Sequence, residues 1–276
     1  MKGIHGSDFV KYCSVMAAAL GLSVGVACAS NLAYDTASNY APGSWSTTPP
    51  NLGNGFGPWN IIVTNNNSPP YVGTFLDTSS AVTNNGYSWG IYANNGGPPY
   101  GSIDLIRPFT GGGLIWGQGF GIKLSSDGVG NGTGGPPDSA FGFDLESAPT
   151  NGGFGTSQLT FVYDGFLSQD DMVLVVGSND PTNIVTNVPF SLLKAGLQVT
   201  VDEGPDGQFT FQAGGIYEYT GTNTGPISQV DVFNENTTGN GYFNNLLVYG
   251  VPEPSSMALV GIGLLGAVAS IRRRKV

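Results

Sequence analysis

Between residues 30 and 250 the chain consists of short apolar or alternating runs, which Gly, Asn and Pro interrupt at close intervals. Glycine supplies 44 of the 276 residues, and Gly and Pro both end helices and mark turns. Short runs that alternate with a period of two, or that are rich in aromatic residues, are typical of β-strands. Few charges, many turn formers and many aromatics also favour an all-β protein. We therefore expect this part of the chain to fold into antiparallel sheets.

Twelve such runs predict strands in about 220 residues, which favours one antiparallel β-sandwich of jelly-roll type. Two packed immunoglobulin-like domains are the alternative. Asp206-Gly207, between two alternating runs, predicts a hairpin turn, and residues 189–195 predict a short helix. The predicted strands are 59–63, 71–76, 88–93, 101–109, 114–124, 140–146, 158–164, 172–177, 197–202, 207–213, 228–233 and 241–250.

The first 29 residues have the parts of a secretory signal peptide. Two lysines precede an uncharged apolar run from Tyr12 to Val26, and Ala27-Cys28-Ala29 fits the small-x-small cleavage pattern. This predicts a signal helix that is cleaved between Ala29 and Ser30. An uncleaved N-terminal anchor and a lipoprotein acylated at Cys28 are the alternatives.

Cleavage at that point would remove both cysteines, Cys13 and Cys28, and the only histidine, His5. The mature protein then has no disulfide. It also has no histidine or cysteine for triad catalysis or for the usual zinc sites. We therefore expect no enzyme activity and no resident metal or cofactor.

A pair of carboxylates is the exception, because glycosidases need little else. Asp144 and Glu146 alternate on the strand 140–146, so both are expected to face the same way. This leaves a carboxylate-pair glycosidase as a less favoured alternative.

The charge of residues 30–250 argues against nucleic acid. This segment has 17 acidic residues and only Arg107, Lys123 and Lys194 as bases, which gives a net charge of −14. Affinity for DNA and RNA comes largely from phosphates neutralised by Lys and Arg. The acids are expected mainly to give solubility. Calcium is a minor alternative, because oxygen-rich loops suit this ion, and the loop acids are Asp127, Asp170, Asp171 and Asp180.

The last 26 residues combine three features in a fixed order. A proline-rich segment, 251–256, precedes an uncharged apolar stretch, 257–271, and a basic tail closes the chain. Fifteen apolar residues are short for a stable membrane helix, which needs about 20, so this hydrophobic helix is expected to be a marginal or transient span. The positive-inside rule keeps the basic tail in the cytoplasm. The segment contains Pro252, Glu253 and Pro254, and the tail contains Arg272, Arg273, Arg274 and Lys275.

This ending resembles the PEP-CTERM sorting signal. The resemblance implies recognition of Pro252, Glu253 and Pro254 by exosortase, a membrane cysteine protease-transpeptidase of Gram-negative bacteria. It also implies an exported protein of the outer surface or extracellular matrix, associated with exopolysaccharide. Such a protein is first anchored in the inner membrane with its C-terminus in the cytoplasm. The Gly- and Asn-rich body resembles the β domains that often precede this signal, whose fold is concanavalin-like. A plain C-terminal anchor is the alternative.

Three parts of the chain are thus predicted: a signal peptide at 1–29, a β-sandwich at 30–250 and a sorting signal at 251–276. We expect a non-catalytic structural or adhesive protein of the cell surface or exopolysaccharide matrix. The alternative is a surface-displayed carbohydrate-binding module, with Trp45, Tyr71 and Tyr100 as candidate sugar contacts in or near loops. The other tryptophans, at 59, 89 and 116, lie in predicted strands and are expected to pack inward.

Overall fold

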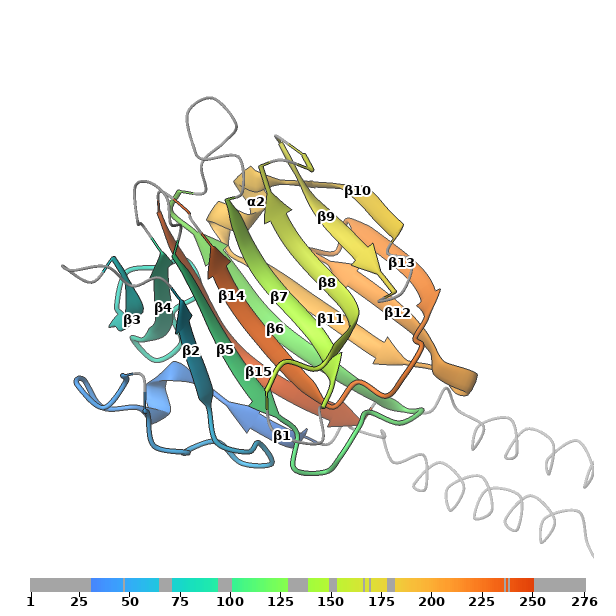
Figure 1. The fold of residues 1–276 in the computed structure, drawn as a ribbon, viewed down its shortest axis with the longest axis horizontal. Helices are drawn as coiled ribbons and strands as arrows, with labels where there is room; N and C mark the ends of the chain where they lie inside the picture. The colour runs from blue at the N-terminus through green and yellow to red at the C-terminus, as the bar shows by residue number, and fades with distance from the viewer. Residues whose placement is uncertain are drawn as a thin grey trace, which may run out of the picture. The chain divides into compact units, whose positions relative to one another are not determined.

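In the computed structural model, the alternating and apolar runs form strands that pair into two antiparallel sheets (Figure 1). The first sheet has eight strands in the order β13-β12-β11-β6-β15-β4-β3, with β1 pairing with β15. The second has seven strands in the order β10-β9-β8-β7-β14-β5-β2. The strands are β1 (Asn31–Asp35), β2 (Asn60–Thr64), β3 (Val72–Asp77), β4 (Ser88–Ala93), β5 (Ser102–Pro108), β6 (Gln118–Ser126), β7 (Ala140–Ser147), β8 (Thr156–Asp164), β9 (Asp171–Val176), β10 (Thr182–Pro189), β11 (Leu197–Glu203), β12 (Gln208–Ala213), β13 (Tyr217–Thr222), β14 (Gln229–Glu235) and β15 (Asn240–Gly250), and the helices are η1 (Ala37–Asn39), α2 (Phe190–Ala195) and η2 (Pro205–Gly207).

The structure describes residues 31–46, 48–64, 71–93, 101–128, 139–148, 153–165, 167–168, 170–177, 182–235, 237 and 239–250. They belong to one compact unit, Ser30–Gly250. The predicted signal and hydrophobic helices lie outside the described residues, and so do the cleavage junction Ala29–Ser30, the sorting residues 252–254 and the basic tail 272–275. The processing points therefore stay predictions.

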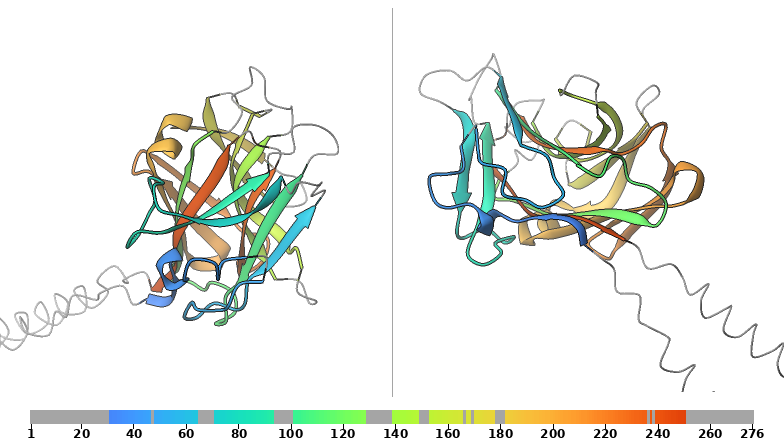
Figure 2. Two further views of the ribbon diagram at one scale, coloured as in Figure 1. Left: turned by 90° about the vertical axis from the view of Figure 1, so that its left-hand side faces the viewer. Right: turned by 90° about the horizontal axis from the view of Figure 1, so that it is seen from below.

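The core lies between the two sheets, which face each other in the right-hand view of Figure 2. Strand β7 shows why the chain folds this way: Phe141, Phe143 and Leu145 are fully buried, whereas Asp144 between them points out of the sandwich. A period of two puts every second side chain on one face of a strand. Each buried aromatic or aliphatic side chain then contributes roughly 1.5–3 kcal/mol of hydrophobic free energy.

The predicted antiparallel β-sandwich is confirmed, with jelly-roll, concanavalin-like layering. The alternative of two immunoglobulin-like domains is wrong, because β15 near the end of the described chain pairs with β1, β4 and β6. The predicted helix at 189–195 is confirmed by α2. The hairpin is confirmed as well: Asp206 adopts a φ of 56° between the paired strands β11 and β12. Strands β1, β10 and β13 were not predicted.

A buried polar cluster joins the N-terminal segment to the second sheet. The Nη1 atom of Arg107 on β5 lies 2.6 Å from the Oδ2 atom of Asp35, and both side chains are fully buried. The hydroxyl of Tyr40 donates to the same Asp35 oxygen over 2.7 Å. The guanidinium group also stacks over the Trp59 ring, 4.4 Å from its centroid. Because a buried charge is costly without partners, this cluster fixes the position of the segment before β2.

Candidate functional site

Four carboxylic acids lie on the outer face of the second sheet, on its central strands β5, β7 and β14. Asp231 pairs in register with Asp144, and the next outward position of β14, Phe233, pairs with Asp104. Glu146 is two residues along β7 from Asp144 and so lies on the same side, as its sequence spacing predicts. We call Asp104, Asp144, Glu146 and Asp231 the acid face.

Burial and mutual repulsion raise the pKa of Asp104, Asp144 and Asp231. Burial, followed by the charge of Glu146, raises the pKa of Asp144 to about 8, against the opposing hydrogen bonds from Ser157 and Thr160. Burial and nearby acids likewise raise the pKa of Asp104 to about 6. The pKa of Asp231 is raised well above its usual range by burial and then by the other three acids. At neutral pH, Asp144 is therefore held mainly in its neutral form, and burial favours the neutral form of Asp231 as well.

The hydrogen bonds of the acid face are unevenly distributed. Glu146 accepts bonds from the Nε2 atom of Gln229 over 2.6 Å and from the backbone N–H of Gly155 over 2.9 Å. Asp144 accepts one from the Ser157 hydroxyl over 2.8 Å. Asp231, only 3% exposed, has an Oδ1 atom without a partner among the described residues. A neutral carboxyl both donates and accepts, whereas a carboxylate only accepts.

Aromatic rings form a second candidate surface, on the outer face of the first sheet. Phe75 on β3 lies 6.1 Å from the ring of Tyr92 on β4 and 5.9 Å from that of Tyr242 on β15. The Phe75 ring lies over Gly90, where an added Cβ would come within 2.5 Å of it, and Tyr92 covers Gly73 in the same way. The glycines therefore let the rings lie against the strands. We call Phe75, Tyr92 and Tyr242 the aromatic face.

Polar groups adjoin the aromatic face at the start of β15. The Tyr242 hydroxyl donates to Asp127 over 2.7 Å, and the side-chain amide of Asn240 donates to the same carboxyl oxygen over 2.9 Å. The backbone N–H of Asn240 donates to the other oxygen of Asp127 over 2.6 Å. Tyr71, which is 41% exposed, comes directly before β3. Aromatic rings can stack on the apolar face of a sugar, and adjacent amide and carboxylate groups can bind its hydroxyls.

The structure does not bring the three predicted sugar contacts together. Tyr71 is exposed, but Trp45 is only 5% exposed, and its ring packs 5.2 Å from Tyr40 and 5.3 Å from Trp59. The prediction of Trp45 as an exposed contact is therefore wrong, because this loop residue completes the core around the Arg107 cluster. Tyr100 lies outside the described residues. The aromatic face was missed, although its signal was present as aromatics and glycines that alternate along 73–76 and 88–93.

Trp116 does not pack inward, in contrast to its prediction. Trp59 and Trp89 pack inward as predicted, but Trp116 is 71% exposed, and its neighbour Ile115 is 63% exposed. The predicted strand at 114–124 begins only at Gln118. Gly117, with a φ of 81°, breaks the alternation that would have turned Trp116 inward.

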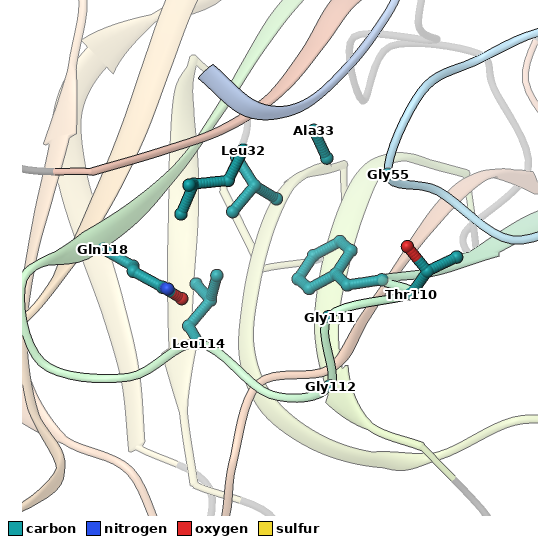
Figure 3. A pocket seen from close by; sticks show the side chains of 10 residues that line it. Leu32, Ala33, Gly55, Thr110, Gly111, Gly112, Leu114 and Gln118 are labelled. Atoms are coloured by element: carbon teal, nitrogen blue, oxygen red, sulfur yellow. The ribbon is translucent and has the colours of Figure 1, made fainter. Parts of the chain in front are cut away.

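A small apolar cavity lies near this turn, between β1, the end of β15 and the segment 109–114 (Figure 3). Its volume is about 140 Å³, and its lining includes Leu32, Phe109, Leu114 and Val248. Pockets for small molecules usually measure at least about 300 Å³. This cavity is therefore too small to hold a sugar ring with its contacts.

No metal centre can be built from the described part of the chain, where no three His, Cys, Asp or Glu side chains gather in a suitable arrangement. Of the loop acids named for calcium, Asp127 binds Asn240 and Tyr242, and Asp180 lies outside the described residues.

Among the described residues, no helix has the length and apolar character needed to cross a bilayer.

Comparison with known proteins identifies the end of the chain. Residues 250–275 match the family model of the PEP-CTERM protein-sorting motif, which confirms the predicted sorting signal. The motif implies an exported protein that exosortase processes and that is transiently anchored in the membrane by its C-terminus. No curated protein matches the chain.

Several solved structures resemble the sandwich at low sequence identity. The globular domain of T. cruzi calreticulin is 11% identical with a TM-score of 0.48, and the match covers 78% of this chain and 94% of that chain. An alginate lyase from Pseudomonas aeruginosa is 10% identical with a TM-score of 0.42, covering 63% and 84%. A galectin from Caenorhabditis elegans is 12% identical with a TM-score of 0.34, covering 52% and 88%. At such identities the likeness concerns the fold alone.

Proposed function

We propose that this protein is a non-catalytic structural or adhesive component of the bacterial cell surface or exopolysaccharide matrix. One observation carries the proposal: the folded β-sandwich, Ser30–Gly250, is directly followed by a sorting motif for exosortase at residues 250–275. The sandwich is exported, held briefly at the membrane and then processed. The acidic body suits this place, because like charges keep such domains soluble and apart.

The mass of the protein recovered from its host tests this sorting. We expect a species that begins near Ser30 and ends near Pro254 in the surface and medium fractions. Replacing Glu253 by Ala should leave residues 257–276 in place and hold the chain at the membrane. Glu218→Ala, at an exposed acid on β13, is the matched control and should be processed normally. A wild-type chain that still carries its basic tail at the surface would contradict the proposal.

A second candidate function, carbohydrate binding, is supported by the aromatic face. Its rings lie against glycines, and Asp127 and Asn240 adjoin them. Phe75 and Tyr92 are partly exposed, whereas Tyr242 is 8% exposed and supports them from below. Apolar rings beside hydrogen-bonding groups are the combination that sugar rings require. We propose that it contacts the host's own exopolysaccharide, with Tyr71 at its edge.

Binding of isolated exopolysaccharide to the full chain tests this second function. Tyr92→Ala should weaken binding at least tenfold, which corresponds to about 1.4 kcal/mol. Phe154→Ala is the matched control, because Phe154 is an aromatic residue that is 53% exposed on the loop before β8. Equal affinity of wild type and Tyr92→Ala would exclude the aromatic face. The proposed export and processing, which the mass experiment tests, would not be affected by that result.

A further inference from the structure

Both ends of the folded unit lie at the same edge of the sandwich. Asn31, where β1 begins, pairs with Tyr249 near the end of β15. On the other side of β15, its last residue, Gly250, pairs with Gln118 at the start of β6. The chain therefore leaves the sandwich toward the sorting motif directly beside the turn that precedes β6.

This turn exposes two large apolar side chains. Trp116 is 71% exposed and Ile115 is 63% exposed, whereas Trp45, Trp59 and Trp89 are each at most 7% exposed. On β1, which lies across β15 from this turn, Leu32 is 43% exposed. Large apolar residues that gather at one edge of a domain mark an interaction surface more often than scattered ones do.

The turn is held in a defined conformation. The backbone N–H of Gln118 donates to the carbonyl of Ile115 over 2.9 Å, and that of Gly117 donates to the carbonyl of Glu203 over 3.1 Å. Gly117 has a φ of 81°, which few other residues adopt without strain. The backbone thus fixes the exposure of Ile115 and Trp116, which are presented outward as a pair.

The length of the following segment sets how far this edge can be from a membrane. Six residues, 251–256, separate Gly250 from Met257, where the apolar stretch of the sorting signal begins. Fully extended, they span about 20 Å. While the signal is inserted, the end of β15 is therefore held within about that distance of the hydrocarbon boundary, and the Trp116 turn lies beside it. Trp side chains favour this interfacial region, where their apolar rings enter the bilayer and their N–H groups stay hydrated.

We propose that the turn Ile115–Trp116 is a lipid-contacting surface, which inserts into the headgroup region of the membrane before the sorting signal is cut. Its partner is a neutral phospholipid surface, because the apolar pair supplies the attraction and the net charge of the body, −14, opposes anionic lipids. The contact would orient the sandwich with the end of β15 toward the bilayer. The sorting motif would then lie close to the membrane surface, where a membrane enzyme such as exosortase can reach it. The proposal rests on C-terminal anchoring and not on the matrix role.

Tryptophan fluorescence of the full chain in phosphatidylcholine vesicles tests the contact. Acyl chains brominated near the headgroup quench only tryptophans that reach the bilayer. We expect them to quench part of the wild-type emission, and we expect vesicles to protect the same part from aqueous acrylamide. Trp116→Phe should abolish the lipid-dependent quenching. Ile216→Ala, at an apolar residue 51% exposed in the turn between β12 and β13, should leave it unchanged.

Flotation of the vesicles separates the possible failures. A wild-type chain that floats without lipid quenching overturns the contact and leaves the anchoring intact. Quenching that persists in Trp116→Phe also overturns it, because another tryptophan would then be the one that reaches the lipid. A chain that does not float overturns the contact together with the anchoring on which it rests.

Discussion

Replacing Asp144 by Asn should stabilise the protein at neutral pH. Asp144 lies on the acid face, where burial and then the charge of Glu146 raise its pKa to about 8. An amide has nearly the same shape as the neutral carboxyl, and its oxygen can accept the hydrogen bond that Ser157 now donates over 2.8 Å. The substitution therefore keeps the contact and removes the cost of holding a proton in the folded state.

The size of the effect follows from the difference in proton binding between the folded and unfolded chains. In the unfolded chain the carboxyl has its ordinary pKa of 3.8. Between about pH 4 and pH 8 the folded state holds a proton that the unfolded state has lost, so stability falls as pH rises. At pH 7 the accumulated cost is about 4 kcal/mol, at about 1.4 kcal/mol per pH unit. Allowing for relaxation around a charge, we expect Asp144→Asn to gain about 2–4 kcal/mol at pH 7 and less than about 0.5 kcal/mol at pH 4.

Urea unfolding, followed by the emission of the buried tryptophans at pH 4, 5.5 and 7, measures this gain. Glu218→Gln provides the control, because this exposed carboxyl accepts a bond from Gln212 that a Gln side chain can also accept. We expect the control to change stability by less than about 0.5 kcal/mol at every pH. The reasoning would be refuted if Asp144→Asn had the same effect at pH 4 and pH 7, or if it destabilised the protein only at pH 7.

Two further substitutions test the core. Arg107→Met keeps most of the side-chain volume but leaves the carboxylate of Asp35 buried without its charge partner, so we expect a loss of about 3–5 kcal/mol in urea unfolding; a loss below about 1 kcal/mol would show that the pair is not needed. Gly142→Ala places a methyl group against the backbone of Phe161 on the adjacent strand. We expect it to lower the free energy of unfolding by about 1–3 kcal/mol or more, measured by thermal unfolding. Gly111→Ala should have little effect, because the added carbon meets no atom within 4 Å.

Most of the strands that the sequence predicted have neighbours on both sides, although β2 and β3, at the ends of their sheets, were predicted as well. Strand β11 is an example, because its residues alternate between buried and outward positions and it pairs with both β6 and β12. The three missed strands lie at or near sheet edges. On β10 and β13, at the ends of their sheets, half or more of the side chains are exposed or partly exposed. An edge strand has one neighbour and a weaker burial pattern. Its sequence is therefore hard to distinguish from that of a loop.

The candidate sites were less predictable because they depend on contacts between distant segments. Trp45 is in a loop, and its burial follows from a cluster that joins Asp35 to Arg107 across 72 positions of sequence. The acid face likewise requires β14 to lie between β5 and β7. Alternation along one strand predicted that Asp144 and Glu146 share a side, but it contained no information on the strands beside them.

The length of β15 separates the two surfaces for which we propose partners. Tyr242, on the aromatic face, lies near the beginning of this strand, and Gly250, beside the Trp116 turn, ends it. Eight residues of extended strand span up to about 27 Å. If the Trp116 edge contacts lipid while the sorting signal is inserted, the aromatic face is held away from the bilayer and toward the polysaccharide. A chain anchored in vesicles should therefore bind exopolysaccharide as tightly as the processed chain does. Weaker binding by the anchored chain would show that the membrane covers the aromatic face, and it would contradict the proposed orientation.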